Sequence, residues 1–286
     1  MLPVEATTNK KGFLVAGAIT KNFAKTFYFS SKFLPRDKRS AAYVIYAICR
    51  ISDDSVDRQG KSADSSKIDI IKSQINSVYN GERLSGDILL AFKETVEKFD
   101  IPKEYFDKLI EGMYLDLTKN RYQDFAELYD YCYKVAGVVG LIMLKIFGYL
   151  DKKAEEHAIE LGIAMQLTNI LRDIKEDFSR GRIYLPQNEM KRFNVVENEI
   201  SKQEIGPNLI ALLKFQIERA RTYYARSIEG IKMIQSVNSR FVICVMKEIY
   251  SGILSAIERN KYDTFSKRAH VNLMGKFMAL SKILLR

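Results

Sequence analysis

The residues best suited to chemistry lie in one stretch of the chain, between Gln166 and Pro186. Within it, side-chain oxygens recur every three or four residues, at Gln166, Asn169, Asp173 and Asp177. On an α-helix this spacing places all four on one face. Oxygen ligands with no histidine or cysteine nearby are typical of Mg²⁺ rather than zinc. A solvated acidic helix face is the alternative for this stretch alone.

A second polar stripe weakens that alternative. Tyr46, Arg50, Asp53 and Asp57 are spaced four, three and four residues apart. Two carboxylates one helical turn apart can share a metal ion, and Mg²⁺ is usually held by one or two carboxylates together with substrate phosphates. Two such helices that face each other across a cavity would form a diphosphate site.

Basic residues accompany both stripes. Aspartates repel phosphates, so metal ions would bridge the two, and Arg50, Arg172 and Arg182 would neutralise the remaining charge. Without an ion, clustered carboxylates also repel one another. Exchange of any of them for asparagine is therefore expected to remove turnover and to leave the metal-free fold at least as stable.

The combination of motifs resembles the squalene/phytoene synthase family, the head-to-head prenyl diphosphate synthases. The resemblance extends from about residue 20 to about residue 280, and it is more specific for the family than for any one member. The matching segments are 53–57 (DDSVD), 131–137 (YCYKVAG), 169–177 (NILRDIKED) and 182–186 (RIYLP).

The resemblance implies an all-α, single-domain helical bundle of the isoprenoid-synthase type around a central cavity. It implies two to three Mg²⁺ ions held by Asp53, Asp57, Asn169, Asp173 and Asp177. The four aspartates would act in catalysis together with Tyr131 and Tyr250. The implied substrate-binding residues are Thr26, Phe27, Tyr46, Arg50, Asp116, Gln166, Asn169, Arg172, Arg182 and Tyr184.

Some of these positions have other interpretations. Ala24 stands where family members usually carry a serine, so it is left out of the site. Thr26 keeps a hydroxyl group nearby, but it is equally suited to cap a helix. Asp116 is suited either to the diphosphate site or to an ion pair with Lys119 or Arg121.

The implied reaction joins two allylic diphosphates through a cyclopropylcarbinyl diphosphate. The chain looks closest to bacterial phytoene synthases, which act on geranylgeranyl diphosphate. Squalene, dehydrosqualene and presqualene diphosphate synthases, which act on farnesyl diphosphate, are the alternatives. No dinucleotide-binding fingerprint follows a strand, so the sequence gives no support for NADPH. A non-catalytic assembly factor on the same fold would have lost the aspartates, and cyclising or head-to-tail terpene synthases lack the companion motifs.

Helical periodicity accounts for most of the chain. The expected helices cover residues 13–23, 37–57, 68–79, 87–99, 102–120, 128–147, 151–178, 207–237 and 240–260. The tail, 261–286, is either a last packed helix or an interfacial one. Glycines within helices indicate close packing or room for a substrate. The wall of an apolar tunnel would comprise Phe27, Ala136, Val139, Gly140, Gly162 and Met165.

The composition allows one large domain, with 286 residues of which 47% are hydrophobic. We expect one domain over residues 1–286, with 1–11 flexible. The net charge of +10 suits an anionic substrate or membrane surface, and no motif indicates nucleic-acid binding. Three scattered cysteines favour a reducing, cytoplasmic compartment. No apolar run reaches the ~20 residues of a span, so any membrane association would be peripheral, on the inner face. The oligomeric state stays open.

Overall fold

The computed structural model describes residues 5–57 and 65–284, apart from the side chains of residues 5–9, 52–57, 282 and 284. The expectation of an all-α fold is confirmed: the described residues contain no strand, only isolated bridges at Arg121–Ile183 and Tyr149–Ile234. The first elements are α1 (Glu5–Phe23), α2 (Lys25–Ser30), the 3₁₀ turn η1 (Ser31–Phe33), α3 (Arg36–Asp57), α4 (Ser66–Tyr79), α5 (Asp87–Lys98) and α6 (Lys103–Thr118).

The remaining elements begin after residue 124. They are α7 (Phe125–Cys132), the π-helical turn η2 (Tyr133–Gly137), α8 (Val138–Phe147), α9 (Ala154–Arg172), α10 (Ile174–Ser179), α11 (Gln187–Arg192), α12 (Glu197–Ser201), α13 (Pro207–Arg226), α14 (Ile228–Lys232), α15 (Val237–Arg259) and α16 (Leu273–Leu284). Among the described residues, no helix is both long enough and apolar enough to cross a bilayer.

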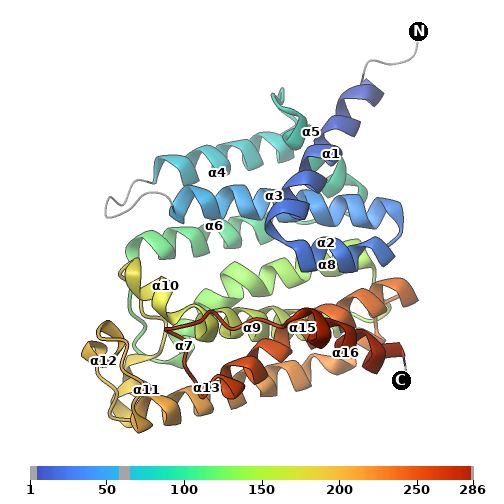
Figure 1. Cartoon of the computed structure of the whole chain (residues 1–286). Helices are drawn as coiled ribbons and strands as arrows, with labels where there is room; N and C mark the ends of the chain where they lie inside the picture. Colours follow the sequence, from blue (N-terminus) through green and yellow to red (C-terminus); the bar gives the residue numbers. More distant parts are fainter. Residues whose placement is uncertain (1–4, 58–64, 285–286) are drawn as a thin grey trace.

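The helices form two layers with a core in each (Figure 1). The first core includes Ile45 of α3 and Phe92 of α5, and it extends to residues of α6 and α8. The second includes Ile163 of α9, Leu213 of α13 and Ile257 of α15. Because α8 and α9 pack against each other, the layers meet along these two helices.

Helix α3 shows how the pattern of the sequence produces this arrangement. Ala41, Val44, Ile45 and Ile48 recur at helical spacing, and all four are buried in the first core. Tyr46, one position beyond Ile45, therefore lies on a different side of the helix. Helix α3 extends to Asp57 with the bounds that the sequence predicted to within one residue.

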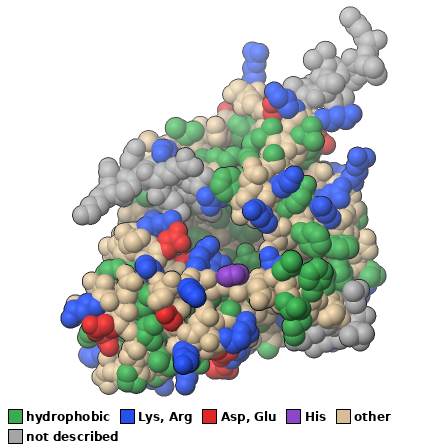
Figure 2. Space-filling view, viewed as in Figure 1, with side chains coloured by type: hydrophobic (Ala, Val, Ile, Leu, Met, Phe, Trp, Pro, Cys, Tyr) green, Lys and Arg blue, Asp and Glu red, His purple; other side chains and the backbone are tan. Residues whose placement is uncertain are grey.

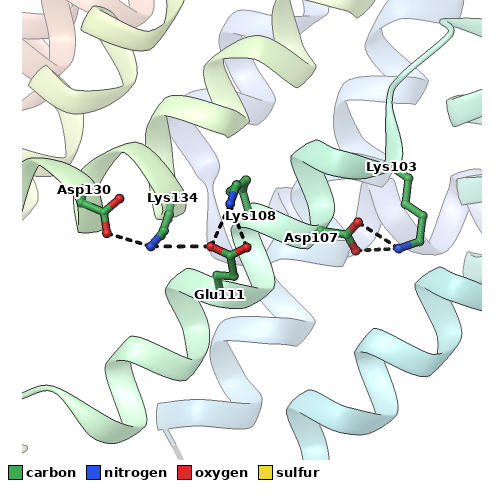
Figure 3. Close-up of polar contacts among 6 residues, drawn as sticks. All are labelled: Lys103, Asp107, Lys108, Glu111, Asp130 and Lys134. Carbon is green, nitrogen blue, oxygen red and sulfur yellow. Dashed lines mark hydrogen bonds and ion pairs between the residues drawn. The ribbon is translucent and has the colours of Figure 1, made fainter.

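The single helix expected over residues 128–147 is wrong, because a π-helical turn separates α7 from α8. Close contact with α6 accompanies this turn: a Cβ atom on Gly112 would lie only 2.6 Å from Val135 Cγ1. Lys134 also binds Glu111 of α6 at 3.6 Å and Asp130 of α7 at 2.7 Å (Figure 3). Such π-turns widen a helix locally and often occur at functional sites.

The expected helix over 151–178 is interrupted as well. Asp173 leaves helical geometry, with φ −108° and ψ 19°, and separates α9 from α10. The backbone bonds from Asp173 N to Asn169 O (2.9 Å) and from Asp177 N to Asp173 O (2.8 Å) nevertheless bridge the junction. The four-residue spacing therefore persists through the kink.

Other helix ends also differ from the expectation. Helix α1 begins at Glu5, within the segment expected to be flexible, while residues 1–4 lie outside the described part. The helix expected over 207–237 is divided into α13 and α14 at Ser227, which is buried and donates from its hydroxyl group to Tyr224 O at 2.8 Å. The tail forms α16, which packs on α15.

The contact between α9 and the π-turn gives a stability prediction. A Cβ atom on Gly162 would lie 2.3 Å from Ala136 O, a backbone atom with little freedom to move. Gly162→Ala should therefore lower the free energy of unfolding, by about 1–3 kcal/mol. Gly17, inside α1, is the control, because a Cβ atom on Gly17 would have its nearest neighbour, Tyr43 Cδ2, at an ordinary contact distance of 3.6 Å. Gly17→Ala should leave stability unchanged or raise it. Urea denaturation measures both, and equal effects at the two positions would contradict the close packing.

Candidate functional site

The junction between α9 and α10 holds the most strongly paired carboxylate of the site. Asp173 accepts hydrogen bonds from Arg172 (Nε to Oδ1, 2.8 Å) and from Arg268 (Nε to Oδ1, 2.7 Å; Nη2 to Oδ2, 3.0 Å). Burial alone would raise the pKa of Asp173, but the bonds from the two arginines outweigh it and hold that pKa below its ordinary value. Asp173 is therefore charged in the folded protein at neutral pH.

Asp177, one turn further on, has the opposite electrostatic environment. Its burial, reinforced by the negative charge of Asp173, raises its pKa from 3.8 to about 7. Arg180 and Arg182 act against this rise without cancelling it. The pKa values of the two aspartates are thus shifted in opposite directions. A cation close to both would favour the charged form of Asp177.

Asn169 and Gln166 continue this polar face toward the interior. Asn169 Nδ2 donates to Gln166 Oε1 at 3.4 Å, whereas Asn169 Oδ1 is buried without a hydrogen-bond partner in the described part of the chain. An unpaired buried acceptor is costly unless a ligand satisfies it. Oxygen donors from Asn169, Asp173 and Asp177 fit the preference of Mg²⁺. No group of three or more His, Cys, Asp or Glu side chains among the described residues is arranged to hold a metal by itself.

A cavity of about 340 Å³ opens between the two layers, and Figure 2 shows the molecular surface hollowed there. This volume lies within the range of small-molecule sites. All six residues expected to form the tunnel wall line the cavity, which confirms the expected wall. Its wall is mostly apolar, and the π-turn contributes Val135 and Ala136.

For the two glycines among these wall residues, the structure favours close packing, one of the two interpretations that the sequence allowed. A Cβ atom on Gly140 would lie 2.3 Å from Ala158 O, and one on Gly162 equally close to Ala136 O. Both glycines therefore allow α8, α9 and the π-turn to approach closely. A larger residue there would collide with backbone before it reached the cavity, so these positions test packing rather than tunnel depth.

The cavity also joins the two stripes. Tyr46 of α3 lines it together with Gln166 and Asn169 of α9. Both helices run in the same direction, and α3 and α10 end on the same side of the molecule (Figure 1). The backbone of α3 carries Asp53 and Asp57 two to three turns beyond Tyr46. The side chains of these two aspartates lie outside the description, so their contact with the second stripe stays a prediction.

Aromatic residues and small side chains surround the polar end of the cavity. Phe27 and Tyr250 line it, as does Ala24, the position at which the serine of the family is absent. The rings of Phe27 and Tyr46 are 6.0 Å apart. Burial raises the pKa of Tyr250, and the nearby positive charges of Arg172 and Arg268 partly oppose this rise. Tyr250 therefore stays protonated and lies close to the ionic cluster.

Thr26 does not cap a helix, because the N-cap of α2 is Ala24, which makes no capping bond. Its hydroxyl group instead accepts a hydrogen bond of 2.9 Å from Lys276 of α16. Arg50 of α3 stacks over the ring of Phe23 at 4.7 Å, outside the cavity lining. The role of Thr26 and Arg50 in binding substrate stays a prediction.

Tyr131 and Tyr184 lie outside the cavity lining. Tyr131 donates to Tyr184 at 3.3 Å, and Tyr184 donates to Asp116 Oδ1 at 2.8 Å. The ion pairs of Lys119 and Arg121 are with Glu127 and Glu197, which disfavours the alternative partners of Asp116.

Tyr184 thus binds Asp116 directly, and Tyr131 supports Tyr184. Any direct contact of Tyr131 or Tyr184 with substrate stays a prediction.

Arg268 and Lys276, which were not among the predicted site residues, reach the site from the C-terminal segment. Arg268 binds Asp173 across 95 positions of the chain, and Lys276 binds Thr26 across 250. No spacing rule links residues so far apart. The signals in the sequence are the basic character of the tail and the segment 262–271 (YDTFSKRAHV), which resembles bacterial phytoene synthases, and neither identifies the partner of Arg268.

Because the pKa values of Asp173 and Asp177 are shifted in opposite directions, exchange of each for asparagine should change the free energy of unfolding with opposite sign. The folded pKa of Asp177 lies above its ordinary value, so the folded state binds more protons between pH 4 and 7, and the free energy of unfolding falls as pH rises through about 7. Without metal, Asp177→Asn should raise this free energy at both pH values, by more than about 1 kcal/mol at pH 8 and by a smaller amount at pH 5, where only part of the loss has occurred.

Asp173→Asn is the matched comparison, and here the expectation from the sequence is reversed. The substitution removes the charge that pairs with Arg172 and Arg268, so it should lower the free energy of unfolding at both pH values. Urea denaturation in EDTA at pH 5 and pH 8 measures both variants. The same sign for both at pH 8 would contradict this electrostatic account.

Comparisons with known proteins agree with this geometry. Residues 20–275 match the Squalene/phytoene synthase family. The chain is 37% identical to the 15-cis-phytoene synthase of Synechococcus elongatus, over 94% of this chain and 91% of that protein. It is 34% identical to the 15-cis-phytoene synthase of Synechocystis, over 97% and 86% of the two chains.

Solved structures show the same fold. A dehydrosqualene synthase crystallised with a ligand superposes with a TM-score of 0.92 at 28% identity and covers 98% of both chains. The squalene synthase HpnC from Alicyclobacillus acidocaldarius superposes with a TM-score of 0.83 at 26% identity and covers 92% of this chain and 98% of that one. The family match, the relatives and the shared fold together establish that this chain belongs to the squalene/phytoene synthase family of prenyltransferases.

Proposed function

We propose that this chain condenses two molecules of geranylgeranyl diphosphate, head to head, into phytoene. The observation that carries the proposal is an apolar cavity whose lining includes residues of both stripe-bearing helices, Tyr46 of α3 and Asn169 of α9. Diphosphate groups would lie at the polar end and prenyl tails along the apolar wall. The relatives named 15-cis-phytoene synthase support the choice of substrate and product.

We also propose Mg²⁺ as the cofactor, with two to three ions held by Asp53, Asp57, Asn169, Asp173 and Asp177. The unpaired Asn169 Oδ1 and the all-oxygen donor set support this choice. Bound Mg²⁺ supplies charge neutralisation to the departing diphosphate. The release of Arg172 and Arg268 from Asp173 would let both guanidinium groups bind phosphate oxygens.

The other residues of the site would bind and protect the substrates. Once the first diphosphate leaves, an allylic cation remains, and the C2–C3 double bond of the second substrate attacks it. The apolar wall around Val139 and Met165 keeps water from this cation. The hydroxyl groups of Tyr46 and Tyr250 and the ring of Phe27, which line the cavity, would orient it. Loss of one proton closes the cyclopropylcarbinyl diphosphate. Departure of the second diphosphate, rearrangement and loss of a second proton then complete phytoene without a reductant.

Farnesyl diphosphate as substrate, with a squalene-type product, is the alternative. The similarity to the structure of a dehydrosqualene synthase favours it. The non-catalytic alternative is disfavoured because all four aspartates are present. We further propose that the protein associates peripherally with membranes on their cytoplasmic face, because its hydrocarbon product is insoluble in water.

Product analysis tests the proposal. The purified chain with Mg²⁺ and without NADPH should convert geranylgeranyl diphosphate into a C40 hydrocarbon. Because the cavity wall is apolar, longer tails gain binding energy, so turnover should exceed that with farnesyl diphosphate by about tenfold or more. Excess EDTA should abolish it. A preferred C30 product, or a requirement for NADPH, would select the squalene-type alternative, and full activity in EDTA would contradict the metal site.

A further inference from the structure

Helix α16 exposes an unusual row of large hydrophobic side chains. Leu273, Met274, Phe277 and Met278 are between 58% and 70% exposed, while Ala279 faces the opposite way and is buried against α15. The helix is thus apolar both toward the protein and away from it. A helix with this pattern outside a core is typical of a surface that contacts lipid or a partner.

The apolar area continues beyond α16. Phe29 of α2 and Phe33 of η1 are 53% and 44% exposed. Their rings are 6.3 Å apart, and the ring of Phe33 is 5.1 Å from that of Phe241 on α15. Phe241 packs against the same small core as Ala279. We call this surface the apolar face; its exposed residues are Phe29, Phe33, Leu273, Met274, Phe277 and Met278.

Figure 2 shows hydrophobic side chains gathered beside the hollow, over the region where Figure 1 draws α2 and α16. Contacts join this surface to the site. Lys276 of α16 binds Thr26, which precedes Phe27 in the cavity lining. Arg268, just before α16, binds Asp173. The apolar face therefore borders the cavity.

The two chain segments that carry the apolar face are rich in lysine and arginine. Residues 264–286 contain five lysines and arginines and no aspartate or glutamate. Residues 21–36, which include α2 and η1, contain four and again no acidic residue. Lys32 lies three positions from Phe29 and is exposed. This combination of exposed hydrophobic side chains and positive charge suits an anionic lipid surface.

We propose that the apolar face docks on an anionic lipid bilayer, so that prenyl tails and the hydrocarbon product pass between the membrane and the cavity without crossing water. The reason for docking rests on the proposed function, because only a lipid product needs this route. The alternative is that a second copy of the chain covers the apolar face. A two-fold contact would bring two identical basic rims together, and their mutual repulsion opposes that arrangement.

Vesicle flotation with the full chain tests the docking surface. The wild type should bind vesicles of phosphatidylcholine with added phosphatidylglycerol about tenfold or more tightly than vesicles of phosphatidylcholine alone. The double variant Met274→Ser/Phe277→Ser should lose about tenfold or more of that binding, since it removes two large apolar side chains. Lys32→Glu should weaken binding to the anionic vesicles and not to the neutral ones.

Val196→Ser is the matched control. Val196 is 57% exposed, similar to Met278, but it lies at the start of α12, outside the apolar face. Its vesicle binding should equal that of the wild type. Circular dichroism should show the same helical content for every variant, and in detergent micelles the double variant should keep wild-type turnover, because the substituted side chains point away from the core.

Two vesicle results would overturn the docking proposal: a wild type that binds no vesicles, or a double variant that binds them as well as the wild type. A wild-type dimer that the double substitution converts into monomers would also overturn it, because the apolar face would then be the contact between two copies of the chain. A different result would contradict the proposed function. A wild type that binds vesicles but forms no hydrocarbon in detergent would retain the docking surface and overturn the proposed reaction.

Discussion

The burial of two neighbouring carboxylates is the constraint on which the rest of the site depends. Asp173 stays charged because Arg172 and Arg268 donate to it, whereas the pKa of Asp177 rises to about 7 because nothing compensates its burial fully. Such an arrangement is unfavourable for a purely structural element. Cations and the diphosphate of a substrate, which we propose to bind here, would offset that cost.

The apolar cavity follows from the helix that carries those carboxylates. Helix α9 has small and apolar residues in its middle and polar ones at its end, so one element lines the apolar cavity and carries the polar stripe. Gly140 and Gly162 let α8 and the π-turn approach α9 to within backbone contact. The C-terminal segment brings Arg268 to Asp173 and Lys276 to Thr26.

Much of this arrangement could be predicted from local patterns. The periodicity of α3 predicted its bounds, and the spacing of Gln166, Asn169 and Asp173 placed them on one face, since such patterns depend on a single helix. The π-turn could not be predicted, because it accompanies the approach of α6 at Gly112. The role of Arg268 depends on a contact across 95 positions. The stabilising role of Asp173 was missed because its sign depends on these distant partners.

The central claim is that the two stripes form one site for metal and diphosphate. Its most direct test is the rise in melting temperature caused by Mg²⁺ with inorganic diphosphate, measured for the wild type, Asp53→Asn, Asp173→Asn and the double variant. Each rise is referred to the same protein without ligand, so differences in intrinsic stability do not enter. If the stripes share one site, either single variant loses most of the rise and the double variant loses no more. A full rise in Asp53→Asn beside a loss in Asp173→Asn would show that α10 alone binds the ligand and would contradict the account.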